Sequence, residues 1–182
     1  MAKLIMWNLI TLDGFFEATE PWSLGAHQRA LDDAFHQFAL NQLLGADMLL
    51  FGRKTYEGMA AHWRGETGAI ADGMNAIPKL VASRTLHIAD WNNTTLVQGD
   101  IATAVRTAKQ NSARDIFVFG SADLSITLMN ENLFDEFRIA VISTLIGHGR
   151  PLFSPAIKPQ QLNLLDTQQL SPGCVVLRYA PR

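Results

Sequence analysis

The chain has 182 residues, 48% of them hydrophobic and 18% charged, which fits one globular domain over residues 1–182 with a sizeable core. Its formal net charge of −2 gives no electrostatic basis for binding nucleic acid or a membrane surface, and no apolar run approaches the roughly 20 residues of a membrane span. The lone Cys174 excludes an internal disulfide and suits a reducing compartment, so we expect a cytoplasmic protein.

The first part of the sequence alternates between short apolar runs and segments with helical periodicity. We expect strands over 3–10, 48–51, 79–82, 94–97 and 116–119, and helices over 26–44, 54–63 and 123–130 and from Asp100, as N-cap, to 109; residues 65–76 are either a helix or a loop. In the first helix Ala34 and Phe38 recur at helical spacing, so this face should be core, and Gly45 is well placed to end the helix.

The end of the sequence changes character. Residues 134–145, 161–170 and 174–179 read as longer strands, and Ser171-Pro172-Gly173 reads as a hairpin turn. Alternating strands and helices followed by antiparallel strands predict an α/β fold, a three-layer sandwich with a mixed, mainly parallel central sheet and antiparallel C-terminal strands.

Two predicted strands run directly into basic, hydroxyl-bearing turns. The first strand ends at Gly52 and is followed by Arg53, Lys54 and Thr55 at the start of a helix, and the second is followed by Ser83 and Arg84. A helix N-terminus offers free backbone N–H groups and the positive end of the dipole, which suits a phosphate group. If the strands are adjacent and parallel, both turns lie at one edge of the sheet and suit a ligand with several phosphates. The alternative for either turn alone is a solvated surface arginine.

These two turns, taken together, resemble the "GRxTxE" and "K-x-V-x-SR" turns of the dihydrofolate reductase superfamily. Three further segments resemble the branch that includes the C-terminal reductase domain of bacterial riboflavin biosynthesis: the Thr11-Leu12-Asp13-Gly14 segment, residues 116–124, and residues 133–137 with 145–153. The resemblance covers nearly the whole chain. It implies a dihydrofolate reductase-like fold and NADPH as cofactor, with both turns on its phosphates.

A small-residue turn follows the apolar strand at 116–119. Small residues at Gly120 and Ser121, between a strand and a helix, would let the pyrophosphate of the cofactor approach the backbone amides. The resemblance implies that Ala122 and Leu124 also belong to the cofactor site. Ser121 replaces the second glycine of the family pattern, so the backbone carries a Cβ there, although its hydroxyl can hydrogen-bond. The alternative is an ordinary tight turn.

The predicted substrate side is aromatic. Trp22 lies in a segment similar to the "PW-x-L" of true dihydrofolate reductases, and His27 stands where those enzymes carry an acid. Trp7 and Phe119 replace charged residues of the riboflavin-pathway reductases, which favours a flat or apolar substrate, with a purely structural core role as the alternative.

Asp13 and His27 are the candidate catalytic groups. Asp13 follows the first strand, where a carboxylate can orient a substrate or relay a proton; the alternative is a simple Asp-Gly turn. The five histidines lack metal-ligand spacing, so we expect no metal site.

We therefore expect an NADPH-dependent reductase of a small heterocyclic or conjugated substrate. The alternative is a non-catalytic NADP(H)-binding protein that has lost the substrate acid. The long, apolar C-terminal strands are followed by no covering helix, which predicts a homodimer through them.

Overall fold

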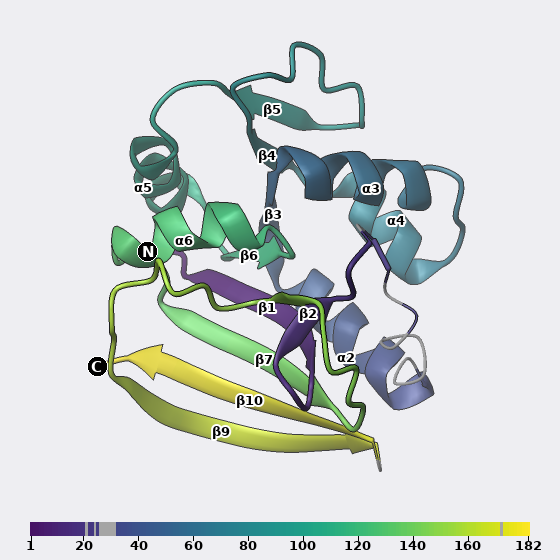
Figure 1. Cartoon of the computed structure of the whole chain (residues 1–182). Coiled ribbons are helices and arrows are strands. Elements are labelled where there is room, and N and C mark those ends of the chain that lie inside the picture. Colours follow the sequence, from purple (N-terminus) through teal and green to yellow (C-terminus); the bar gives the residue numbers. More distant parts are fainter. Residues whose placement is uncertain (21, 24, 26–31, 172) are drawn as a thin grey trace.

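The computed structural model describes all residues except 21, 24, 26–31 and 172 (Figure 1). Its centre is an eight-stranded sheet with the order β5-β4-β3-β6-β1-β7-β10-β9. The strands are β1 (Leu4–Thr11), β3 (Ala46–Gly52), β4 (Lys79–Ala82), β5 (Thr94–Val97), β6 (Asp115–Phe119), β7 (Glu136–Ile142), β9 (Leu162–Ser171) and β10 (Cys174–Pro181). The described helices are α2 (Asp33–Leu44), α3 (Arg53–Trp63), α4 (Ala69–Ala76), α5 (Ile101–Asn111) and α6 (Ala122–Asn130).

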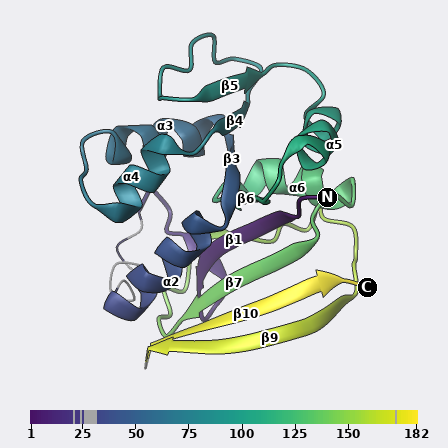
Figure 2. The same ribbon diagram turned by 180° about the vertical axis from the view of Figure 1, so that it is seen from behind.

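The sheet is mixed and mainly parallel. β1 pairs in parallel with β6 and β7, and β3 pairs in parallel with β4 and β6, whereas β10 runs antiparallel to both β7 and β9. Helices α2, α3 and α4 cover one face of the sheet, and α5 and α6 cover the other (Figures 1 and 2). This arrangement confirms the predicted three-layer fold with antiparallel C-terminal strands.

Each face has its own core because strand side chains alternate between faces. On the α5/α6 face, Met6 of β1 and Val118 of β6 pack with Leu128 of α6. On the opposite face, Phe51 of β3 and Phe117 of β6 pack with Tyr56 of α3. The central strands are therefore buried on both sides, which explains why they read as continuous apolar runs.

The first described helix starts later than predicted. We expected one helix over 26–44, but α2 begins at Asp33 because Asp32 has an extended backbone and its carboxylate accepts a hydrogen bond from the Phe35 amide at 2.9 Å. Residues 26–31 lie outside the described residues. Gly45 ends the helix as predicted, although with right-handed backbone angles. The Asp100 cap of α5 is also confirmed, and residues 69–76 are the helix α4.

The predicted strand over 134–145 is too long. β7 ends at Ile142, and the chain then leaves the sheet through Gly147 and Gly149, which both have positive φ. After these glycines the chain forms β8 (Arg150–Pro151), which pairs with a short strand β2 (Phe15–Glu17) that the sequence did not predict. No described helix is long and apolar enough to cross a membrane.

The chain leaves the two central parallel strands, β3 and β6, toward opposite faces of the sheet. β3 is followed by α3 on one face, and its neighbour β6 is followed by α6 on the other (Figure 1). Such a change of direction opens a crevice at the carboxyl ends of the strands, which is where open α/β sheets bind ligands.

Candidate active site

A cavity of about 1050 Å³ lies at this crevice. It is lined by residues from β1, the ends of β3, β4 and β6, the starts of α3 and α6, and α2. Its volume is at the upper end of the range for small-molecule and cofactor sites. The lining divides into a polar part at the two helix starts and an apolar part rich in aromatic rings.

Two helix N-termini open at the polar part. The helices α3 and α6 begin after Gly52 and Ser121, and neither start has a side-chain cap among the described residues, whereas α2 and α5 are capped by aspartates. Uncapped starts leave backbone N–H donors and the positive dipole end available to an anion. Arg53 and Lys54 add positive charge at the same place. The predicted anion-binding turn is thus brought to the cavity.

Ser121 joins the two helix starts. Its Oγ accepts a hydrogen bond from the Gly52 amide at 2.9 Å, and its own amide donates to Thr55 Oγ1 at 3.0 Å. Thr55 is buried, so its hydroxyl serves this contact in the protein rather than standing free for a phosphate. Ser121 has left-handed backbone angles (φ 60°), a conformation that glycine adopts more easily.

Asn8 is a site residue that the sequence analysis missed. Its side chain is buried, and its Oδ1 accepts a hydrogen bond from the Gly120 amide at 2.6 Å. Gly120 has φ +59°, and a Cβ there would meet Thr55 Oγ1 at 3.2 Å. A lone polar residue inside an otherwise apolar first strand was the available signal, because a buried amide side chain needs partners.

The second basic turn lies beside the first. Gly52 and Ala82 are paired in the parallel register of β3 and β4, which confirms that the two turns share one edge of the sheet. Ala82 lines the cavity, but Ser83 and Arg84 are not among its lining residues. Ser83 Oγ instead accepts hydrogen bonds from the next turn, including the Leu86 amide at 2.9 Å, and Arg84 is exposed.

The predicted aromatic pair is brought together at the apolar part. The rings of Trp7 and Phe119 meet edge to face with centroids 5.4 Å apart, and both residues line the cavity. Trp7 also contacts Phe35 and Phe38 of α2. Its indole Nε1 is buried and has no hydrogen-bond partner among the described residues. The two rings therefore belong both to the core and to the cavity wall.

Trp22 forms another part of the wall. Its side chain is 40% exposed, its backbone has φ 64°, and its ring lies directly on α3 at Gly58. A Cβ at Gly58 would lie 2.0 Å from the ring, so only glycine leaves room for it. The predicted substrate residue Trp22 thus borders the cavity from a loop and not from the sheet.

Neither candidate catalytic residue is found in the described cavity wall. Asp13 is not among the cavity-lining residues. Its carboxylate accepts hydrogen bonds from the Thr11 hydroxyl at 2.5 Å and from the amides of Ile146 and Gly147 at 3.0 and 2.7 Å. The Thr11 hydroxyl, foremost, and these amides lower the pKa of Asp13 below its usual value. This position anchors a turn and does not support the predicted proton relay. His27 lies outside the described residues, and its role stays a prediction.

A charge cluster at the rim was also missed. Arg150 pairs with Glu17 at 3.3 Å and with Asp123 at 2.5 Å, and all three residues line the cavity. Burial lowers the pKa of Arg150, but the two carboxylates outweigh burial and raise it. Among the described lining residues, Glu17 and Asp123 are the carboxylates, so each is already paired. His36 and His62 also line the cavity.

The chain matches a known family over most of its length. Residues 2–176 match the family described as the RibD C-terminal domain. The uncharacterized protein YyaP of Bacillus subtilis (strain 168) is 29% identical over 185 residues, covering 97% of this chain and 94% of YyaP. YwjB, an uncharacterized protein of the same strain, is 27% identical, covering 97% of both chains.

Solved structures show the same fold. A protein from Shewanella sp. PV-4 has a TM-score of 0.76 at 19% identity, covering 99% of each chain. RibD of Acinetobacter baumannii has a TM-score of 0.75 at 18% identity, covering all of this chain and 58% of RibD. Dihydrofolate reductase from Enterococcus faecalis, in complex with NADP(H), has a TM-score of 0.64 at 12% identity, covering 99% and 96%. The fold is thus dihydrofolate reductase-like.

Proposed function

Because the chain belongs to the RibD C-terminal domain family, a family of NAD(P)H-dependent reductases, we propose that it is an NADPH-dependent reductase of a small, flat heterocyclic or conjugated substrate. The observation that carries this proposal is the pair of uncapped helix starts, α3 and α6, that open into one cavity. Two such anion sites, held together by Ser121, suit the two phosphates of a dinucleotide.

The residues at the helix starts fit this cofactor. The amides at the beginning of α3 and α6 would bind its diphosphate, and Arg53 and Lys54 would supply charge. Gly120 keeps the backbone open between them, since a Cβ there would enter the cradle at Thr55. When bound, the nicotinamide supplies the hydride, while the chain supplies position and electrostatics.

The substrate is proposed to be neutral at its reacting end. The apolar part of the cavity presents Trp7, Phe119 and Trp22, which suit a flat ring. The two described lining carboxylates are paired with Arg150, so neither stands free to bind a cationic group. The imidazoles of His36 and His62 also line this cavity, and an imidazole is the side chain that enzymes most often use as a general acid.

Calorimetric titration with NADPH tests the cofactor part of the proposal. Lys54→Glu should abolish binding while keeping α3 intact, because a negative charge at a helix N-terminus favours the helix. Lys158→Glu is the matched control, since Lys158 is also exposed but lies outside the cavity lining. Equal NADPH affinities of the two variants would contradict the proposed site.

The alternative is a non-catalytic NADP(H)-binding protein. It is favoured by the pairing of both lining carboxylates, which leaves no free acid in the described wall. NADPH oxidation with a panel of quinones, conjugated carbonyls and reducible heterocycles separates the two functions. Turnover with any of them supports the reductase, and binding without turnover across the panel supports the alternative.

We also propose that two copies associate through the C-terminal strands. β9 is the last strand of the sheet, and Leu162, Leu164 and Leu165 on it are 40%, 56% and 50% exposed. A long edge strand that exposes several leucines is a surface that proteins commonly bury. A second copy of this chain would cover the same surface on both subunits.

A further inference from the structure

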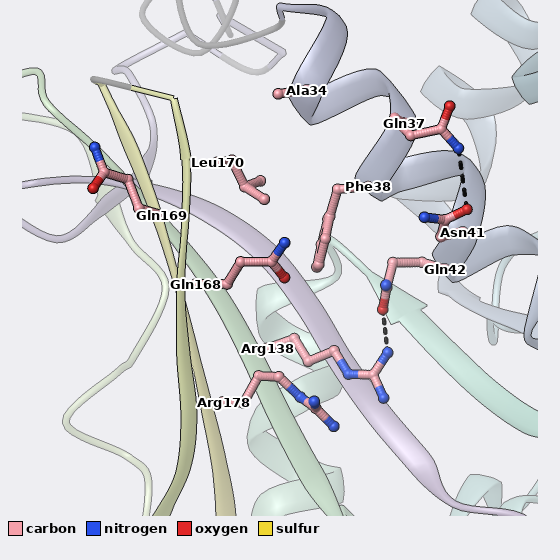
Figure 3. A pocket seen from close by; sticks show the side chains of 10 residues that line it. All are labelled: Ala34, Gln37, Phe38, Asn41, Gln42, Arg138, Gln168, Gln169, Leu170 and Arg178. Carbon is pink, nitrogen blue, oxygen red and sulfur yellow. Dashed lines mark hydrogen bonds between the residues drawn. The ribbon is translucent and has the colours of Figure 1, made fainter.

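A second cavity lies between α2 and the β9–β10 hairpin (Figure 3). Its volume is about 400 Å³, enough for a small molecule. Unlike the main cavity, it is lined largely by amide and guanidinium side chains. They come from α2, β7, β9 and β10 and include Gln37, Asn41, Gln42, Arg138, Gln168 and Arg178.

One buried carboxylate holds both arginines of this cavity, Arg138 and Arg178, in place. Arg138 and Arg178 are direct cross-strand partners on β7 and β10. Their Nε groups donate to the same oxygen, Oε1 of the fully buried Glu136, at 2.7 and 2.8 Å. This contact uses the Nε–H of each guanidinium and leaves its Nη groups for other partners. Figure 3 shows the two guanidinium groups beside one another at the cavity.

The cluster holds more positive than negative charge. Lys3 also pairs with Glu136, through Oε2 at 3.4 Å, so three cations share this carboxylate. Asp166 lies 3.8 Å from Arg178 Nη1 and its side chain is half exposed, so it offsets only part of the excess. Arg138 lies only 13% exposed, where screening by solvent is weak. Positive charge that is partly buried and incompletely neutralised favours an anion.

The surrounding amides make the site selective for a polar ligand. Arg138 Nη1 donates to Gln42 Oε1, which orients the Gln42 amide at the cavity (Figure 3). Gln37 and Asn41 are bonded to one another at 3.1 Å on the same helix. Each amide offers both a donor and an acceptor, so the wall can bind hydroxyl or amide groups next to an oxyanion.

We propose that this cavity is a second binding site, for the carboxylate or phosphate group of a small polar molecule. A guanidinium presents parallel N–H donors that match either oxyanion. The site is separate from the turns proposed to bind the cofactor, which follow β3, β4 and β6. Gln42 lines both cavities, and Trp7, in the main cavity wall, pairs in register with Arg138. A ligand bound in the second cavity would therefore affect the wall of the main cavity through Gln42 and Trp7.

Thermal unfolding with malonate or inorganic phosphate, each against sodium chloride at equal ionic strength, tests this site. We expect a saturable rise in the unfolding midpoint with at least one of the two anions and none with chloride. Malonate alone indicates a carboxylate ligand, and phosphate alone indicates a phosphate ligand. Arg178→Gln should weaken the effective anion about tenfold, since it removes charge-assisted hydrogen bonds.

Two matched variants separate this site from others. Arg106→Gln removes an arginine from an exposed pair with Glu131 and should keep the parent response. Arg53→Gln removes a cation at the cofactor turn and should also keep it. If Arg53→Gln loses the response and Arg178→Gln keeps it, the anion binds at the cofactor turn, and the second site is refuted while the proposed function stands.

A second readout covers the case in which Arg178→Gln fails to fold. In the parent protein, the side-chain Nε–H resonances of Arg138 and Arg178 and the amide resonances of Gln42 and Gln168 should shift with added anion, with one common affinity. Unchanged resonances at saturating anion, or equal responses to the anion and to chloride, would overturn the proposal.

Discussion

The Oγ of Ser121 accepts a hydrogen bond from the Gly52 amide at 2.9 Å and so links the starts of α3 and α6. This serine stands where the family pattern has a second glycine. Because the Gly52 amide donates to this hydroxyl, it is not available to a phosphate. The same hydrogen bond fixes the distance between the two helix starts. The departure from the pattern is therefore a cross-link between the two halves of the site.

This cross-link predicts an ordering of two variants. Ser121→Ala loses the hydrogen bond and keeps the left-handed backbone, so its free energy of unfolding should fall by about 1–2 kcal/mol. Ser121→Gly loses the same bond but relieves the backbone strain, so it should be the more stable of the two. Urea unfolding of both variants and the parent checks this order. A less stable glycine variant would contradict it.

Arg84 is predicted to set the preference for NADPH over NADH. It is exposed in the turn that follows β4, the strand next to β3, and the resemblance places the cofactor phosphates, including the 2′-phosphate, at the turns after these two strands. Arg84→Gln should lower NADPH affinity about tenfold and leave NADH affinity nearly unchanged. Calorimetry with both cofactors measures this, with Arg106→Gln as the control for loss of one exposed arginine. A parallel loss of both affinities would argue against a 2′-phosphate contact.

Gly58 is predicted to hold Trp22 in place. Gly58→Ala puts a Cβ 2.0 Å from the original position of the Trp22 ring, so the ring must move away from α3. The helix itself tolerates the change, since alanine favours a helix by about 1 kcal/mol over glycine. Acrylamide should then quench tryptophan fluorescence more strongly, an increase that disappears when Trp22→Phe is added. Gly73→Ala in α4, where a Cβ would lie 3.4 Å from Leu43, should leave quenching unchanged.

We predict that the free energy of unfolding falls in a step on acidification, because Glu136 has a lowered pKa in the folded protein. Burial raises its pKa, but Arg138 and Arg178 outweigh burial and bring the pKa to about 2, from an ordinary 4.5. Between these values the unfolded chain binds more protons than the folded one, so stability is lost as pH falls from about 4.5 to about 2. The loss should be roughly 3 kcal/mol, on the scale of 1.36 kcal/mol for each pKa unit.

Urea unfolding across this pH range checks the step. Glu136→Gln should be less stable at neutral pH and should lose less stability on acidification than the parent. Glu131→Gln, from an exposed pair, is the control and should follow the parent profile. A Glu136→Gln profile parallel to that of the parent would show that other carboxylates cause the acid transition.

The proposed dimer depends on the exposed face of β9. Leu164→Lys should shift light scattering after size exclusion from twice the chain mass to the monomer mass, because a charge would be buried between copies. Ile88→Lys is the control, since Ile88 is 76% exposed near the opposite end of the sheet. A monomeric parent at tens of micromolar, or a Leu164→Lys protein that stays dimeric, would refute this surface.

The sequence was sufficient for the order and type of most elements. The runs ending at Gly52, Ala82 and Phe119 are apolar because those strands are buried on both faces, and this signal is strong and local. It failed at Asp32, where an N-cap starts the helix α2 inside a segment that keeps helical spacing. It also failed after Ile142, where apolar residues continue but two glycines with positive φ turn the chain away.

The site was predicted in part for a similar reason. The helix starts at Arg53 and Ala122 follow from their strands, so the anion-binding turns could be located. The partners of Asn8 and Arg150 could not, because both contact residues that are distant in sequence. The sequence could not show whether Asp13 is a catalytic acid or a turn anchor, because the amides that it anchors are more than a hundred residues away.

The central position of β1 has a consequence for the order of assembly during synthesis. This strand leaves the ribosome long before its two neighbours, β6 and β7, and the Asn8–Gly120 bond spans 112 residues. A nascent chain that ends before β6 therefore exposes an apolar strand with both edges open, a state prone to aggregation. We expect the growing chain to depend on chaperone protection until residues beyond 142 have emerged.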